Sequence, residues 1–177
     1  MRDIADLTEE ELTRSLTYAG FVLVAYELVK TLIVGPIKAF YSGVTFGQGL
    51  PFKSYDVDVL SRHKNEFEAC LLYLRDFMKA LDSDDVLAIQ GLRKHRNDLA
   101  HDLVSRLSQL DIAAYLPLLE KAERALFKLS NYQTYMEVGS DPAFQNLDIN
   151  WDTVKGHQYL VFEQILRKVR ILQGDKR

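Results

Sequence analysis

The chain has 177 residues, which is typical of a single domain (residues 1–177) that buries a core without disulfides or metal ions. Cys70 is the only cysteine, so an intrachain disulfide and a cysteine-based zinc site are excluded. The net charge of −3 and the pI near 5.8 argue against a protein that coats nucleic acid nonspecifically, because such binding depends on many Lys and Arg contacts to phosphates.

The apolar run of residues 16–41 is long enough to suggest a membrane span, but its composition argues against one. Three charged residues and a proline interrupt it: Glu27, Lys30, Lys38 and Pro36. Its longest uncharged piece, residues 15–26, is well short of the ~20 residues that a span requires. Residues 1–11 are acidic, unlike the positively charged start of a secretory signal. We therefore expect a buried helix in a cytoplasmic protein without a membrane partner.

Local signals predict where this first helix begins and ends. Thr8 and Glu11 have the spacing of a capping box, so the helix should begin at Glu9. Proline lacks an amide hydrogen and restricts the preceding residue, so Gly35-Pro36 should kink or end the helix.

Glu27 and Lys30 are three residues apart and can pair on one face of the first helix. We interpret them as a structural ion pair. The alternative places them beside the functional site of the central helix.

A second helix is predicted from Asp56 onward. Its apolar residues recur at nearly alternating three- and four-residue spacing: Val57, Leu60, Phe67, Leu71, Leu74, Met78 and Leu81. This seam predicts lengthwise packing against a neighbour, in the same chain or in a second copy. Ser83 is the expected cap of a third helix, and the short connection predicts that the two helices are antiparallel neighbours.

The remaining chain predicts two more helices. Pro117 suits the first turn of a fourth helix. Its apolar stripe is Leu119, Ala122, Leu126 and Leu129. Asn150 or Asp152 can cap a last helix, whose apolar residues are Val154, Val161, Ile165, Val169 and Leu172. Glycines, prolines and short polar residues predict loops near 42–55 and 138–152. The expected fold is all-α, an antiparallel bundle of about five helices.

The third helix carries the residues that point to chemistry. Leu92, Leu99 and Leu103 mark its buried stripe. At about 100° per residue, Asn97 and His101 lie about 40° apart on one flank, with Arg96 between that flank and the stripe. A guanidinium, an amide and an imidazole are thus expected together at the border of the core, where they can bind and cleave a phosphodiester.

Residues 93–96 form a basic run, of which Arg93 and Lys94 lie nearest to the Asn97 and His101 side. Such a run is commonly a solvated face. The alternative is that Arg93 and Lys94 bind a phosphodiester backbone on either side of the scissile phosphate. The sequence leaves both open.

The sequence predicts neither a metal site nor a cofactor. His95 and His101 are six residues apart, or about 240° around a helix, so they face different directions. His63 and His157 have no partners at metal-ligand spacing, and no Glu-x-x-His pair occurs.

The segment Arg96-Asn97-Asp98-Leu99-Ala100-His101 resembles the signature of the HEPN superfamily: an Arg, a polar residue, a short spacer and a His. Many HEPN proteins are metal-independent endoribonucleases that act as toxins or phage-defence effectors. The resemblance implies RNA as substrate, Arg96, Asn97 and His101 as catalytic residues, and a homodimer. It also implies that an antitoxin protein can be a partner. Some members carry, two positions after the His, a Tyr that a nucleotidyltransferase antitoxin modifies. Leu103 stands here, so this kind of antitoxin is uncertain.

The residues also suggest a mechanism. RNA supplies its own nucleophile, the 2′-hydroxyl, and a histidine with a pKa near the reference value of about 6.5 can act as base or acid. Arg96 can bind two phosphate oxygens. One chain offers one such histidine, whereas cleavage needs both a base and an acid, so a two-fold dimer would complete the site. Two alternatives stay open: a non-catalytic HEPN-like nucleotide- or RNA-binding or regulatory dimer, and a purely structural helical dimer. Without the resemblance, His101 would be read as a core-edge histidine bonded to a carbonyl.

Overall fold

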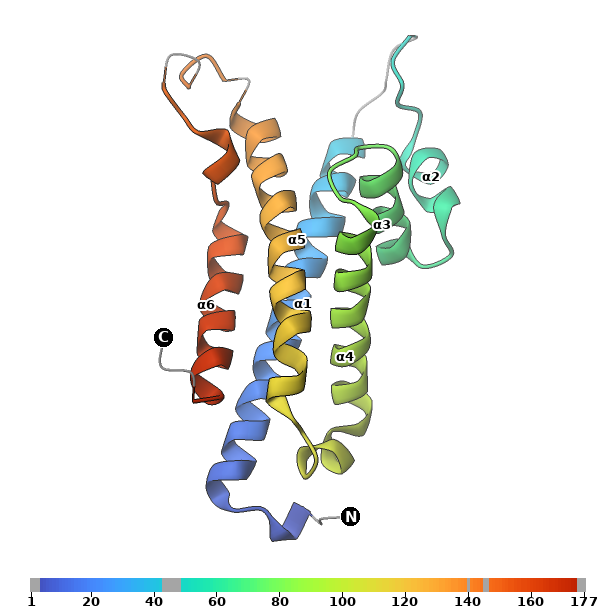
Figure 1. The fold of residues 1–177 in the computed structure, drawn as a ribbon. Helices are drawn as coiled ribbons and strands as arrows, with labels where there is room; N and C mark the ends of the chain where they lie inside the picture. Colours follow the sequence, from blue (N-terminus) through green and yellow to red (C-terminus); the bar gives the residue numbers. More distant parts are fainter. Residues whose placement is uncertain (1–3, 43–48, 140, 145–146, 175–177) are drawn as a thin grey trace.

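The computed structural model describes residues 4–42, 49–139, 141–144 and 147–174, and every regular element in these ranges is a helix. Four long helices lie along a common direction (Figure 1): α1 (Glu9–Tyr41), α4 (Ser83–Leu107), α5 (Ile112–Val138) and α6 (His157–Leu172). Two short helices, α2 (Tyr55–Asp58) and α3 (Glu66–Asp76), lie beside one end of α1. Three 3₁₀ turns complete the set: η1 (Ile4–Asp6), η2 (Leu60–Arg62) and η3 (Trp151–Thr153). The all-α prediction is confirmed.

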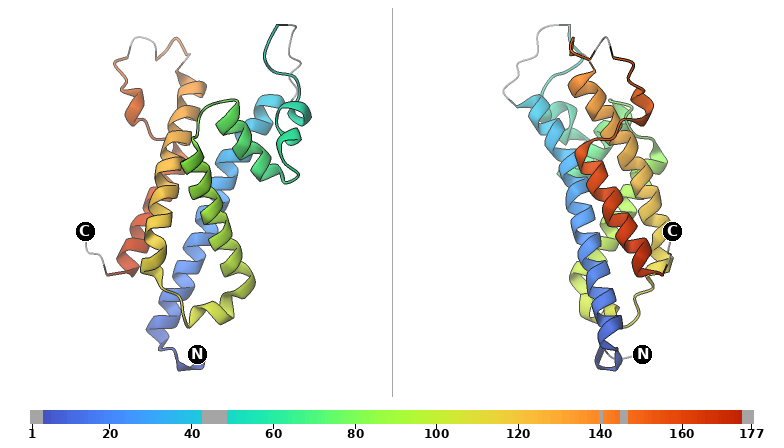
Figure 2. Two further views of the ribbon diagram at one scale, coloured as in Figure 1. Left: turned by 45° about the vertical axis from the view of Figure 1, so that its right-hand side comes forward. Right: turned by 90° about the vertical axis from the view of Figure 1, so that its left-hand side faces the viewer.

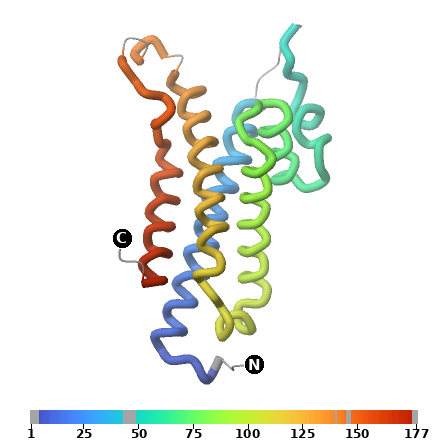
Figure 3. The backbone as a smooth tube through the Cα atoms, in the orientation of Figure 1, coloured from blue at the N-terminus to red at the C-terminus, as the bar shows by residue number. Residues whose placement is uncertain are grey.

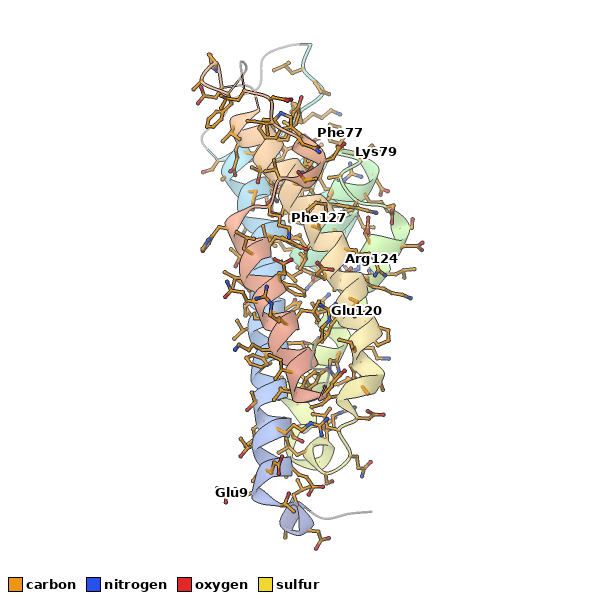
Figure 4. All side chains as sticks on the ribbon, turned by 60° about the vertical axis from the view of Figure 1, so that its left-hand side comes forward. Glu9, Phe77, Lys79, Glu120, Arg124 and Phe127 are labelled. Carbon is orange, nitrogen blue, oxygen red and sulfur yellow. The ribbon has the colours of Figure 1, made fainter. Side chains whose placement is uncertain are left out.

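Successive long helices run in opposite directions, as the tube in Figure 3 shows. Helix α1 packs against α3, α4, α5 and α6, and α5 also packs against both α4 and α6. The two further views in Figure 2 show α1 extending beyond the other helices toward the N-terminus. The start of α1 at Glu9 lies at the opposite end of the molecule from Phe77 and Lys79, which follow α3 (Figure 4).

Helix α1 begins where the capping box predicts. The Thr8 hydroxyl accepts a 3.1 Å hydrogen bond from the Glu11 amide, and the Glu11 carboxylate accepts a 2.9 Å bond from the Thr8 amide. By length and composition α1 also meets the criterion for a membrane-spanning helix, a test that core helices of soluble proteins pass as well. Its buried residues lie in the core: Tyr18, Ala19, Val22, Ala25, Tyr26, Val29, Leu32, Ile33 and Ile37.

The sequence predicts that α1 ends or kinks at Gly35-Pro36. In the structure α1 does not end there but continues through Pro36 to Tyr41. Pro36 has no amide hydrogen to donate to the Leu32 carbonyl one turn earlier. The side chain of Gln133 on α5 donates to this carbonyl instead, at 2.6 Å. A tertiary contact therefore satisfies the acceptor that would otherwise stay unpaired inside the protein.

The prediction of a single helix over residues 56–81 is wrong. The segment forms α2, η2 and α3, with His63 in an extended conformation between the last two. Asn65 caps α3 by accepting a hydrogen bond from the Glu68 amide, and a cap needs non-helical backbone where the seam predicted a helix. The lengthwise seam is therefore not formed: Val57 is exposed, whereas Phe67, Leu71 and Leu74 are buried.

Three helix starts also differ from the sequence predictions. Asp82, not Ser83, caps α4 and forms a capping box with Asp85. Asp111 caps α5 by accepting from the amides of residues 113 and 114, which leaves Pro117 inside the helix rather than in its first turn. Helix α6 follows Gly156, because Asn150 caps the η3 turn instead.

The loops and stripes agree better with the sequence. Of the loop near 42–55, residues 43–48 lie outside the described part, and α2 begins at Tyr55. The loop near 138–152, of which residues 140, 145 and 146 lie outside the described part, follows the end of α5 and leads into η3. The predicted stripe of α5 is buried: Leu119, Ala122, Leu126 and Leu129. In α6, Val169 is buried, but Val161, Ile165 and Leu172 are only partly so, and the core is filled mainly by Tyr159, Phe162 and Leu166.

Candidate functional site

Helix α4, which packs against α1 and α5, carries the Arg96 to His101 motif. Its predicted stripe is confirmed, since Leu92 and Leu99 are buried and Leu103 is packed against the core. The backbone leaves helical geometry at Asp102, where φ is −123° and ψ is 29°. The motif therefore lies on the continuous part of α4, and the break follows His101 directly.

Arg96 lies at the seam between α4 and α1. Its Nη1 donates to Oδ1 of Asn97 at 3.2 Å, and its Nη2 lies 3.3 Å from a carboxylate oxygen of Glu27 on α1. The guanidinium stands 5.2 Å from the centre of the Tyr26 ring. Its Nε is buried and has no hydrogen-bond partner among the described residues. The structure thus brings Arg96 and Asn97 together, as the sequence predicts.

Glu27 belongs to the same cluster, which favours the alternative reading of this residue. Besides Arg96, it pairs with Lys30 at 3.9 Å. Both Glu27 and Lys30 are 54% exposed, so the pair lies on the open side of α1 beside the motif. A surface groove runs there, lined by Leu23, Val24, Glu27, Leu28, Thr31 and Arg96.

His101 does not join this cluster. It is exposed, and it has no hydrogen bond to Arg96 or Asn97 in the described part of the chain. Arg96 and His101 are five positions apart, which is about 140° around a helix. The expectation that His101 lies at the border of the core is therefore wrong, as is its reading as a core-edge histidine.

The two predicted substrate-binding residues point in different directions. Arg93 donates to Glu68 on α3 at 2.5 Å and stands 5.5 Å from the Phe67 ring, so its charge is already paired. Lys94 is exposed. At positions i, i+3 and i+7, Lys94, Asn97 and His101 share one face of α4, which leaves Lys94 as the better placed of the two.

The sequence did not lead us to predict the buried position of His95, a titratable residue on α4. It is 4% exposed, and its Nε2 lies 2.8 Å from the Tyr18 hydroxyl. Its ring stacks on Tyr115 with centroids 3.7 Å apart. Burial lowers the pKa of His95 to about 4, so the ring is neutral near pH 7. The signal was its spacing, because His95 lies three residues after Leu92 and four before Leu99, on the buried stripe.

The described residues contain no group of three or more His, Cys, Asp or Glu side chains placed to hold a metal ion. Cys70 is buried, and burial raises the pKa of its thiol. The thiol lies 3.5 Å from the Tyr55 hydroxyl. A buried thiol with a raised pKa is a poor nucleophile, so Cys70 belongs to the core.

Comparison with known proteins identifies no relative. No family model matches the chain, no curated protein matches it, and no solved structure matches it.

Proposed function

We propose that this chain is a metal-independent endoribonuclease of HEPN type, acting in the cytoplasm as a toxin or phage-defence effector. The observation that carries the proposal is the contact between Arg96 and Asn97 on a long helix whose exposed face presents Lys94 and His101. A cation that can bind phosphate and an imidazole open to solvent are the two groups that the chemistry requires.

In the proposed reaction the RNA 2′-oxygen attacks the adjacent phosphorus. The O2′–P bond forms and the P–O5′ bond breaks, so the products carry a 2′,3′-cyclic phosphate and a 5′-hydroxyl. One His101 takes the proton from the 2′-hydroxyl, and a second His101, in the protonated form, gives a proton to the leaving 5′-oxygen. Arg96 stabilises the charge on the phosphate oxygens, and Asn97 orients the substrate.

The second histidine comes from a second copy of the chain. We propose an antiparallel helical bundle that forms a homodimer, with α4 near the two-fold axis. Two apolar side chains of α4 are exposed: Leu87 near its start is 63% exposed, and Val104, three residues after His101, is 69% exposed. Large apolar side chains left exposed along one helix are typical of a surface that another protein covers.

One observation favours the alternative, a non-catalytic HEPN-like dimer that binds nucleotides or RNA or regulates a partner such as an antitoxin. In a single chain, Arg96 contacts Glu27 and lies about 140° around α4 from His101. Incubation of the purified chain with labelled RNA in excess EDTA separates the two functions. Cleavage supports the endoribonuclease, whereas bound but intact RNA supports the alternative.

A further inference from the structure

The contact between Glu27 and Arg96 occupies the part of Arg96 that the proposed reaction needs. A bidentate grip on phosphate uses two parallel N–H donors of the guanidinium. In this structure both terminal nitrogens already face oxygen acceptors, Nη2 the Glu27 carboxylate at 3.3 Å and Nη1 the Asn97 amide oxygen at 3.2 Å. A phosphate that takes these two N–H donors has to replace both acceptors, and a phosphate on the remaining N–H donors lies beside the Glu27 carboxylate, which repels it.

We propose that Glu27 is a built-in competitor for phosphate at Arg96, so that RNA binds by displacing the Glu27 carboxylate. The proposal rests on Arg96 being the phosphate-binding residue of the proposed function. It adds a residue on α1 that sets the affinity of the site for RNA.

Three features make the contact displaceable. Glu27 is 54% exposed and Arg96 is 30% exposed, so solvent screens their attraction. Their closest N–O distance of 3.3 Å is long for a charge-assisted hydrogen bond, which is typically about 2.7–2.9 Å. Lys30 lies 3.9 Å from Glu27, so a cation stays beside the carboxylate after Arg96 has moved to phosphate.

The position of Arg96 fits the same role. Glu27 holds the guanidinium on the α1 side of α4, whereas Lys94, Asn97 and His101 share the outward face. Asn97 lies between Arg96 and His101 around the helix, about 100° from the first and about 40° from the second. Release from Glu27 lets the long Arg96 side chain swing past Asn97 toward His101, where the scissile phosphate would lie.

Another surface ion pair of the chain provides a matched control. Glu120 on α5, labelled in Figure 4, pairs with Arg170 on α6 at 3.0 Å, and the two side chains are 35% and 41% exposed. Neither belongs to α1 or α4. Replacement of Glu120 by Gln removes the same charge from a similar contact without touching the candidate site.

The first arm of the test measures whether Glu27 covers Arg96, independently of RNA. The wild-type chain, Glu27→Gln and Glu120→Gln are treated with phenylglyoxal, which modifies guanidinium groups, and the rate at each arginine is read by peptide mass spectrometry. In Glu27→Gln we expect the modification rate at Arg96 to rise two- to fivefold and the rate at Arg170 to stay unchanged. In Glu120→Gln the rate at Arg170 should rise and the rate at Arg96 should stay unchanged. A two- to fivefold change corresponds roughly to the free energy of an exposed ion pair. An unchanged rate at Arg96 overturns the proposal.

The second arm measures the affinity for a 2′-O-methylated RNA oligonucleotide, which the proposed reaction cannot cleave. Glu27→Gln should tighten binding roughly two- to fivefold, whereas Glu120→Gln should not. The gain should vanish when Glu27→Gln is added to Arg96→Ala. Weaker or unchanged binding by Glu27→Gln, or an equal gain without Arg96, overturns the proposal. Arg96 can become more reactive in Glu27→Gln while neither the wild-type chain nor Glu27→Gln binds RNA. In that case the proposed function itself fails, and Glu27 is a structural ion-pair partner only.

Discussion

The Tyr18 hydroxyl and Nε2 of His95 lie 2.8 Å apart inside the core, and this hydrogen bond ties α1 to α4. The other ring nitrogen of His95, Nδ1, is buried without a hydrogen-bond partner among the described residues. Protonation would place a charge between Tyr18 and the stacked Tyr115 ring, where little water can solvate it. The neutral ring is therefore part of the folded state.

This contact predicts a loss of stability in mild acid. Desolvation lowers the pKa of His95 from 6.5 to about 4 in the folded chain, so the unfolded chain binds the additional proton first. The contribution is complete above pH 6.5 and is lost as the pH falls toward 4, with a total on the order of 3 kcal/mol. Urea unfolding between pH 7.5 and 4.5 measures it.

His95→Phe keeps a ring in the stack and removes the titrating group, so its stability should fall less between pH 6.5 and 4.5 than that of the wild type. His157→Gln, which alters an exposed histidine at the start of α6, is the control and should behave as the wild type does. Equal losses in His95→Phe and the wild type would show that other groups cause the acid sensitivity.

A second prediction concerns the pairing of Gln133 with the Leu32 carbonyl below Pro36. Gln133→Ala should lower the free energy of unfolding by about 1–2 kcal/mol, because the Leu32 carbonyl loses its hydrogen-bond donor inside the protein. Pro36→Ala restores an amide hydrogen at the position that normally donates to residue 32. In this background Gln133→Ala should cost clearly less, and additive costs in the double variant would refute the explanation of the continuous helix.

The same segment shows why part of the fold could not be predicted. The Thr8 and Glu11 box is local, so the start of α1 follows from the sequence. Below Pro36, the Leu32 carbonyl is paired with Gln133, about a hundred residues later in the chain, and no local rule can detect this contact. In residues 56–81 two local signals competed, and the Asn65 cap prevailed over the apolar periodicity.

The candidate site was predictable to a similar degree. The spacing of Arg96 and Asn97 was enough to place them together, because neighbouring residues on a helix keep a fixed relation. The leucine spacing also carried the burial of the two histidines, although the motif drew attention to His101 instead. His95 lies on the stripe between Leu92 and Leu99 and is buried, whereas His101 lies about 200° around the helix from Leu99 and is exposed.

The catalytic assignment predicts the effect of two substitutions. His101→Ala and Arg96→Ala should each abolish RNA cleavage and relieve any growth arrest on expression. The helical content should remain, because His101 is exposed and Arg96 is only partly buried. Circular dichroism and thermal melting check the fold of each variant. If both variants fold and still cleave RNA, the assignment of these residues is wrong.

The proposed dimer predicts a molecular mass in solution and predicts which substitutions dissociate the dimer. Light scattering at micromolar concentration should give about 41 kDa, twice the 20.4 kDa of one chain. Leu87→Glu and Val104→Glu place charges on the outer side of α4 and should shift the chain toward the monomer, with loss of cleavage. Ile171→Glu, on an exposed position of α6, is the control and should leave the dimer intact. An active monomer would remove the need for a composite site.

Cleavage of a defined RNA in excess EDTA, with analysis of the ends, tests the central claim most directly. The proposed roles need only imidazole, guanidinium and the RNA 2′-hydroxyl, so we predict persistent cleavage that leaves 2′,3′-cyclic phosphate and 5′-hydroxyl ends. DNA and RNA methylated on the 2′-oxygen at the cut position should resist. Because the proposed reaction uses a neutral imidazole in one protomer and a protonated imidazole in the other, the rate should fall at both low and high pH. Cleavage that stops in EDTA and returns with magnesium, or that leaves 5′-phosphate ends, would contradict the account.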